Sequence, residues 1–191
     1  MKLFNKIIFV ALFSAFCFNS CVEDMPVPPS EPTDEPISYT GLVINEIDGN
    51  GKFIELYNSS DKEISLKGVE IIKNETGSWW TGGDVKIAAK GRYTIAQTGQ
   101  TIAGSNEQTG TSGISPKKTI KFELIIGETL IDSFSRVKAD GALDANCTPD
   151  YGSEPKYSFS RCPDGTGSFG LAVPSCGAAN PATAAGTIVT N

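Results

Sequence analysis

The chain has 191 residues, with 16 lysines and arginines, 22 aspartates and glutamates, and no histidine. Lys2 and Lys6 precede Cys21 and no acid does, so a chain that starts at Cys21 retains 14 basic residues against 22 acids, a net charge of −8. Nucleic-acid binding depends on Lys and Arg neutralising phosphates, so this balance argues against a nucleic-acid partner. The lack of histidine excludes Ser-His-Asp and Cys-His nucleophile systems and histidine-containing zinc sites. We expect no cofactor.

Residues 1–20 are predicted to be a targeting segment. Lys2 and Lys6 form a positive region, residues 7–16 are apolar, and Ser20 precedes Cys21. This ending resembles the lipobox of bacterial lipoproteins, in which the cysteine receives a diacylglyceryl group and becomes the new N-terminus. The resemblance makes Cys21 the lipidated residue, although Phe18 and Asn19 replace the commoner Leu and small residue. An ordinary cleaved signal peptide is an alternative, and so is a membrane span, for which the apolar run is short because a span needs about 20 residues.

Residues 21–38 are predicted to be the lipidated cysteine and a linker. The run PVPPSEPTDEP, residues 26–36, is rich in proline and acids, so it cannot form a packed core and favours an extended spacer. Acids shortly after the lipidated cysteine also resemble the export signal of surface-exposed lipoproteins in the Bacteroidetes. A solvated linker has the same composition. These features predict an outer-membrane, surface-exposed lipoprotein of the cell envelope.

The stretch LVINEIDGNGKFIELYN, Leu42–Asn58, predicts two strands joined by a tight turn. Apolar and polar residues alternate in both halves, which is typical of strands with one buried face. Between the halves, residues 48–51 tolerate the positive φ angles of a hairpin turn. A hairpin alone cannot bury enough surface to be stable, so the rest of the domain must cover it.

The whole domain, residues 39–180, is predicted to be all β. Strands are expected at Leu42–Ile47, Phe53–Asn58, Val69–Lys73, Val85–Ala88, Tyr93–Ala96, Thr119–Ile126, Thr129–Phe134 and Tyr157–Arg161. Several short strands at this spacing predict a β-sandwich. Residues 98–116, rich in Gly, Ser and Thr, are expected to be a mobile loop, and residues 181–191 a flexible C-terminal tail.

A set of motif residues resembles the lamin-tail domain family. The family pattern contains a strand that ends in Asn-Glu, an aromatic-Ile-Glu-Leu-x-Asn strand, a Leu-x-Gly turn and a late Ser-x-x-Arg-x-x-Asp-Gly. The matching positions are Asn45, Glu46, Phe53–Leu56, Asn58, Leu66, Gly68, Gly91, Ser158, Arg161, Asp164 and Gly165. The chain departs from the pattern at Val69, where Trp is frequent, and at Cys176, where proline is common. The resemblance implies an immunoglobulin-like β-sandwich and does not imply an enzyme.

Two features of the hairpin suggest chemistry. Glu46 and Glu55 lie on adjacent predicted strands and could face each other like the paired acids of glycosidases. Such residues more often form hydrogen bonds to the backbone or, here, to Arg161, so we favour a structural role for the two glutamates over a catalytic role in a hydrolase. Residues 48–50, Asp-Gly-Asn, hint at a calcium loop but lack its later acidic ligands, so we favour a hairpin turn and expect no metal site.

Trp79 and Trp80 follow Gly77-Ser78 and precede Gly82-Gly83, so they are expected in a loop between strands. If they are exposed, they could stack on a sugar ring or anchor a partner protein, which makes them the candidate ligand-binding residues. Burial of at least one is favoured, because large aromatics are mostly buried.

Cys147, Cys162 and Cys176 remain once the leader is removed and Cys21 is lipidated. Their odd number permits one disulfide and one free thiol. We favour Cys162–Cys176, with Cys147–Cys162 or three buried thiols as alternatives.

Together these observations predict a membrane-tethered lipoprotein whose sandwich binds an unidentified partner without catalysis. Partners of such folds bind loops at one end or pair with a sheet edge. A polysaccharide-binding module, through Trp79 and Trp80, is the main alternative.

Overall fold

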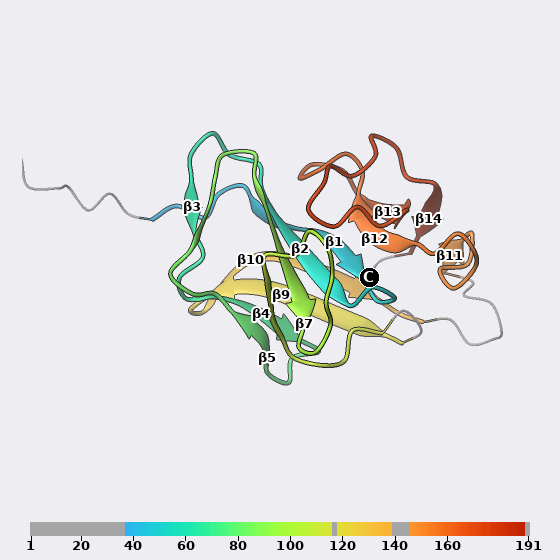
Figure 1. The fold of residues 1–191 in the computed structure, drawn as a ribbon, viewed down its shortest axis with the longest axis horizontal. Coiled ribbons are helices and arrows are strands. Elements are labelled where there is room, and N and C mark those ends of the chain that lie inside the picture. The colour runs from blue at the N-terminus through green and yellow to red at the C-terminus, as the bar shows by residue number, and fades with distance from the viewer. Residues whose placement is uncertain (1–36, 116–117, 139–145, 190–191) are drawn as a thin grey trace, which may run out of the picture. The chain divides into compact units, whose positions relative to one another are not determined.

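The computed structural model describes residues 37–115, 118–138 and 146–189 (Figure 1). Within these ranges all regular secondary structure is β, which confirms the predicted class. The strands are β1 (Leu42–Asp48), β2 (Phe53–Asn58), β3 (Ile64–Ser65), β4 (Val69–Lys73), β5 (Ser78–Thr81), β6 (Lys86–Ile87), β7 (Arg92–Gln97), β8 (Glu107–Gly110), β9 (Ile120–Ile126), β10 (Thr129–Arg136), β11 (Cys147–Thr148), β12 (Ser158–Arg161), β13 (Phe169–Ala172) and β14 (Gly186–Ile188).

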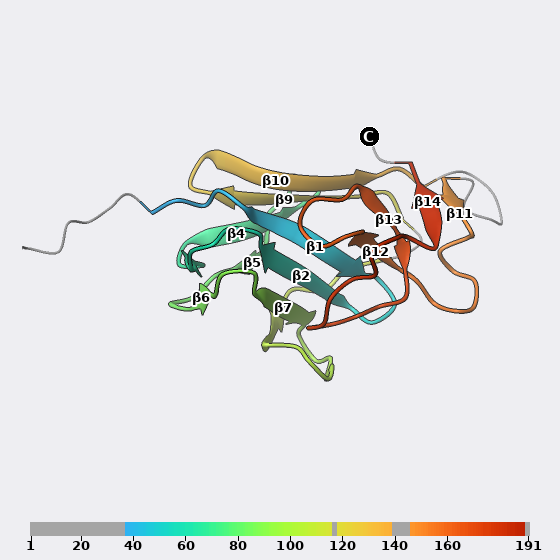
Figure 2. The ribbon, with the colours of Figure 1, turned by 90° about the horizontal axis from the view of Figure 1, so that it is seen from above.

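The strands form two main layers. One is an eight-stranded sheet in the order β11-β14-β13-β12-β1-β2-β7-β8, and the other is a four-stranded sheet in the order β10-β9-β4-β5. Figure 2 shows β9 and β10 in a layer above β1 and β2. The short pair β3-β6 forms a third, separate sheet. This arrangement confirms the immunoglobulin-like β-sandwich.

The predicted hairpin is confirmed, but β1 contains a bulge. Its register with β2 shifts between Ile44 and Glu46, so Asn45 is the extra residue. Ile44 and Ile47, three positions apart, therefore both belong to the apolar core, whereas strict alternation would place them on opposite faces. Beyond the bulge, Glu46 lies directly opposite Glu55.

The core lies between the two sheets. It is built mainly from aliphatic and aromatic side chains of the central strands, all fully buried: Ile44, Ile54, Leu56, Val69, Ile71, Ile95, Phe122, Leu124 and Leu171. Such burial contributes about 1.5–3 kcal/mol for each large side chain, so this core is the main source of the domain's stability.

Two predictions about irregular segments are wrong. Residues 98–116 contain β8, which runs parallel to β7. The expected C-terminal tail contains β14, which pairs with both β13 and β11. Both strands are short and include glycine, so they lack the apolar alternation that identifies a strand in a sequence.

Candidate functional site

Glu46 and Glu55 form the centre of a buried polar cluster. They lie opposite each other on β1 and β2, and neither side chain is exposed. Glu55 stands between two core residues of β2 in the sequence, so it projects from the face of the sheet that is turned away from the core. We call residues 173–180, which follow β13 and bond to both carboxylates, the strap. The strap, rather than the second sheet, covers this face.

Glu55 accepts hydrogen bonds on both carboxylate oxygens. Asn45 Nδ2 donates to Oε1 at 2.9 Å, while Thr94 Oγ1 and Gly177 N donate to Oε2 at 2.9 and 2.8 Å. Arg92 Nε lies 3.8 Å from Oε1. Burial raises the pKa of Glu55, and these donors and the Arg92 charge oppose that rise.

Glu46 has fewer partners and no cation among the ion pairs of the described residues. Ser158 Oγ lies 2.6 Å from Oε1, Ser175 N lies 3.1 Å from Oε1, and Ser175 Oγ lies 2.8 Å from Oε2. Burial raises the pKa of Glu46 to about 7. The serine hydrogen bonds lower the pKa, and the neighbouring Glu55 raises it further.

Asn45, the bulge residue, ties the cluster to the turn after β12. Its Nδ2 donates to Asp164 Oδ1 at 2.8 Å, and its Oδ1 accepts from Gly165 N at 3.0 Å. Gly165 has φ of +72°, and a Cβ there would lie 2.6 Å from the Tyr57 ring. Only glycine fits both demands. Arg92 forms an ion pair with Asp164, which completes the cluster.

Arg161 does not contact the glutamates, contrary to one of our expectations. Its guanidinium pairs with Asp132 of β10 at 2.9 Å and donates from Nε to Ile44 O at 2.9 Å. Asp132 in turn accepts from Ile44 N at 2.8 Å. Both backbone groups of Ile44 next to the bulge are thus bonded to one ion pair, which joins the two sheets.

Asn58 lies apart from the cluster, at the other end of β2. Its Nδ2 donates to the carbonyls of Lys62, Ile87 and Ala88, so it holds together the turns around β3 and β6. The structure therefore brings together six of the motif residues, namely Asn45, Glu46, Glu55, Ser158, Asp164 and Gly165. The sequence analysis missed four members of the cluster, Arg92, Thr94, Ser175 and Asn180. The polar Thr94 within the apolar strand RYTIA was the one available signal.

This cluster is arranged for structure rather than for catalysis. Both glutamates are inaccessible, and their oxygens are engaged by side chains and backbone of the same domain. Asp48 also serves the hairpin, since its Oδ1 accepts from Asn50 N at 2.8 Å and from the Tyr151 hydroxyl at 3.3 Å. Across the part of the chain that the structure describes, no group of three or more Cys, Asp or Glu side chains is placed to hold a metal ion.

Comparison with known proteins identifies the domain. A family model of the lamin tail domain matches residues 35–138, more than half of the chain. The chain belongs to the lamin tail domain family. No curated protein matches it. The matched span ends before β12, and the C-terminal motif is connected to it by the pairing of β12 with β1, by the bonds of Arg161 to Asp132 and Ile44, and by those of Asp164 and Gly165 to Asn45.

Trp79 and Trp80 are not surface residues of this lamin tail domain. They lie on β5 rather than in a loop, and their side chains are 1% and 3% exposed. The β4–β5 register shifts beside Trp79, and such a bulge allows two consecutive residues to turn inward. Trp79 packs on Phe122 in the core, and Trp80 packs on Tyr93. The favoured prediction, burial of at least one tryptophan, is confirmed for both, so the exposure that a ligand-binding role requires is not present.

The three cysteines in the described residues are free thiols, and the favoured Cys162–Cys176 disulfide is absent. Cys162 Sγ lies 3.7 Å from Ser160 O, and Cys176 belongs to the strap. Burial raises the pKa of all three thiols, that of Cys176 to about 11, so they are neutral at pH 7.

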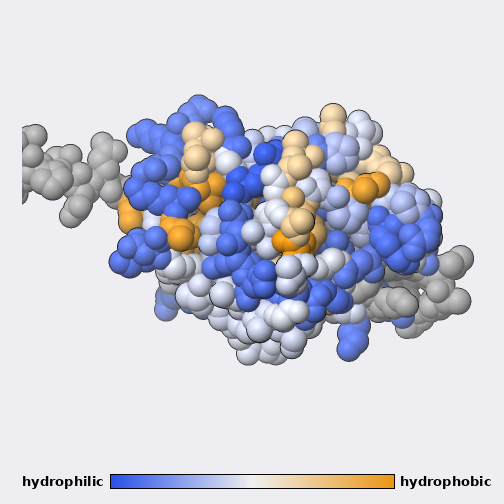
Figure 3. All heavy atoms as spheres, viewed as in Figure 1, coloured by the Kyte–Doolittle hydropathy of each residue, from blue (hydrophilic) through white to orange (hydrophobic). Residues whose placement is uncertain are grey.

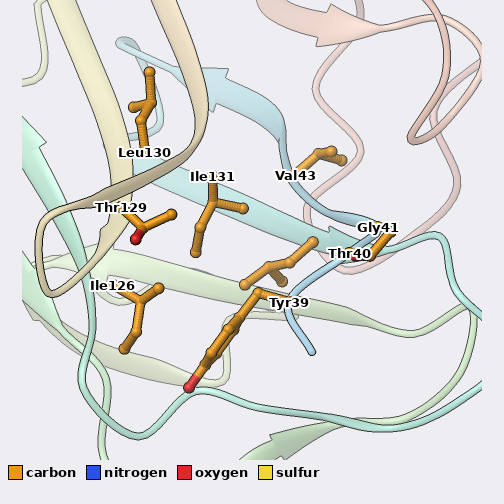
Figure 4. Close-up of a pocket in the computed structure, with 9 residues that line it drawn as sticks. Tyr39, Thr40, Gly41, Val43, Ile126, Thr129, Leu130 and Ile131 are labelled. Carbon is orange, nitrogen blue, oxygen red and sulfur yellow. The ribbon is translucent and has the colours of Figure 1, made fainter. Parts of the chain in front are cut away.

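An apolar groove of about 460 Å³ lies where the two sheets separate. Its walls are residues 39–43, at the start of β1, and Thr129–Ile131 of β10, with Ile126 beside them. Figure 4 shows Ile131 and Tyr39 facing the same space between β10 and the start of β1. Leu130 is 55% exposed at its rim. On the face drawn in Figure 3, by comparison, hydrophobic residues occur as small patches among hydrophilic ones.

β10 is the outer strand of its sheet, with β9 as its only strand partner among the described residues. On the opposite side of the sandwich a backbone hydrogen bond joins the two sheets: Thr111 N, next to β8, donates to Trp79 O of β5 at 2.8 Å. The groove therefore marks the open side of this lamin tail domain. No helix in the described ranges has the length and apolar character needed to cross a membrane.

Proposed function

We propose that this protein is a bacterial lipoprotein, anchored through Cys21 in an outer membrane of the Bacteroidetes type. Its lamin tail domain would be displayed at the cell surface, where it binds a protein partner without catalysis. The proposal rests first on the order of the sequence: a charged and apolar leader, Ser20-Cys21, a proline-rich and acidic run, and then the domain. Two or three acyl chains at about 0.8 kcal/mol per buried methylene would hold the protein on the membrane permanently.

The groove between β1 and β10 is the observation that supports binding best. One of its walls is the outer edge of β10, and an exposed strand edge can accept an extended peptide through backbone hydrogen bonds. Its lining is apolar, so alternate side chains of the bound segment would be apolar as well. We therefore propose an extended, apolar segment of a protein partner as the occupant. The argument for a glycan ligand depended on exposed tryptophan side chains, and both tryptophans are buried.

The anchor is tested by metabolic labelling of cells with an alkyne analogue of palmitate. The full chain should incorporate label and fractionate with membranes, and Cys21→Ala should abolish both. Cys17→Ala is the matched control and should label normally. Labelling that survives Cys21→Ala would refute the anchor.

The groove is tested separately by in-cell photocrosslinking. A photoreactive residue replaces Leu130, at the groove, or Val173, which is 57% exposed and outside it. We expect adducts from position 130 that mass spectrometry maps to one extended segment of a protein, and none from position 173. Adducts with lipid or glycan at 130, or equal adducts at both positions, would overturn the groove as a protein-binding surface.

A further inference from the structure

The hydroxyl of Ser175 in the strap stands between two oxygen atoms. It lies 2.8 Å from Glu46 Oε2 and 2.6 Å from Asn180 Oδ1. A serine hydroxyl carries one hydrogen and can donate to one of the two. The other short contact needs a hydrogen from a different source.

Asn180 cannot supply that hydrogen. Its Nδ2 donates to the carbonyls of Asn45 at 3.2 Å and Arg161 at 3.0 Å, which fixes the orientation of the amide. The atom facing Ser175 is therefore the acceptor Oδ1. Glu46 is the remaining candidate, and a proton on its Oε2 would complete an unbroken chain from Glu46 through Ser175 to Asn180.

The neighbouring carboxylate presents the opposite arrangement. Both oxygens of Glu55 receive hydrogen bonds from groups that donate, namely Asn45 Nδ2, Thr94 Oγ1 and Gly177 N. Glu55 is therefore suited to the ionised form. Two buried carboxyls in register on adjacent strands are costly to ionise together, so a proton on Glu46 also relieves their repulsion.

The other groups around Glu46 do not compensate for a second charge. The Cys162 and Cys176 thiols are neutral at pH 7, as described above. Arg92 of β7 is paired with Asp164 and faces Glu55, while Arg161 of β12 is paired with Asp132 of β10. Among the described residues, ionised Glu46 would have two serine hydroxyls and one backbone amide as its hydrogen-bond donors.

We propose that Glu46 holds a proton and donates it from Oε2 to Ser175 Oγ, and that this proton fastens the strap to the sheet. Loss of the proton to water leaves a buried carboxylate opposite ionised Glu55 and breaks the chain to Asn180, so the strap is released. No residue of the strap lies in a strand, and its other hydrogen bonds to the rest of the domain include those from Gly177 N to Glu55 and from Asn180 to Asp164 and to the carbonyls of Asn45 and Arg161. The strap is thus a pH-sensitive cover over the polar face of β1 and β2. The raised pKa of Glu46, about 7, places the transition near neutrality.

Hydrogen exchange of the full chain, followed by mass spectrometry from pH 5 to 9, tests this inference. After correction for intrinsic exchange, the protection of a peptide covering the strap should fall by up to about tenfold per pH unit as the pH rises towards 7 and should level off above 7, because opening releases a proton only while Glu46 is protonated in the closed chain and ionised in the open one. A peptide from β9 should show no such fall. Glu46→Gln keeps an oxygen for Ser158 and gives Ser175 an N–H donor in place of the proton, so its strap should stay protected at every pH. Glu63→Gln, at an exposed glutamate, should behave as wild type.

Wild-type protection that does not change with pH, or an unchanged pH dependence in Glu46→Gln, would overturn the proposal. A second measurement avoids reliance on variants. The carboxyl ¹³C resonance of Glu46 in the wild-type chain should titrate with a midpoint near 7. A resonance already fully ionised at pH 5 would show that Glu46 holds no proton.

Discussion

Asp132 is one side chain that supports the backbone of a strand in the other sheet. It accepts from Ile44 N and pairs with Arg161, and its side chain is 15% exposed. Asp132→Ala leaves a backbone N–H and a guanidinium without their partner, so we expect a loss of about 2–4 kcal/mol in the free energy of unfolding. Urea denaturation measures it. Glu128→Ala, at an exposed residue in the preceding turn, is the control, and equal losses in both variants would contradict the role of Asp132.

The bulge at Asn45 is a feature of β1 that the sequence pattern does not predict. The alternation in LVINEID predicted the strand and its apolar content correctly. It could not locate the extra residue, because the groups that stabilise the bulge, Asp132 and Arg161, lie 88 and 117 positions away from Ile44. The motif residues Asn45, Glu46 and Glu55 could be named from the sequence, but their shared cluster depends on this bulge.

At the scale of elements, β14 makes the C-terminal region part of the sheet. A Cβ at Gly186 would lie 2.0 Å from Thr148 O, a backbone atom that cannot move freely. We expect Gly186→Val to lower the free energy of unfolding by about 1–3 kcal/mol through overpacking. Thr187→Val, at the exposed neighbour in the same strand, should have little effect. Thermal unfolding measures both, and a neutral Gly186→Val would mean that this region behaves as the predicted tail.

The sequence around β5 predicts a loop although the segment is a strand. GSWWTGG has glycine on both sides and no alternation of apolar and polar residues, and alternation is the pattern that identifies a strand. The fold supplies what the local sequence lacks: Phe122 packs on Trp79, and Glu107 accepts from the Trp80 indole N–H. Long alternating segments such as β9 were predicted to within one residue, because their own pattern specifies them.

At the scale of the whole molecule, buried carboxyls set the dependence of stability on pH. Burial raises the pKa of Glu46, to about 7, and also those of Glu55 and Asp48. Each group binds its proton more tightly in the folded chain than in the unfolded chain. Their contribution to stability is therefore fully present below the unfolded pKa, near 4.5 for a glutamate, and is lost as the pH rises through the folded pKa.

We therefore expect the free energy of unfolding to fall between pH 4.5 and 7.5, with Glu46 alone accounting for about 3 kcal/mol. Glu75 acts in the opposite direction, since its hydrogen bond with Lys121 lowers its pKa, but it is exposed and its effect is screened by solvent. Urea unfolding at each pH measures the slope. Glu46→Gln should flatten it and Glu63→Gln should not. Stability that rises with pH over this interval would mean that the buried carboxyls are ionised in the folded domain, since only groups that bind protons more tightly when unfolded produce that sign.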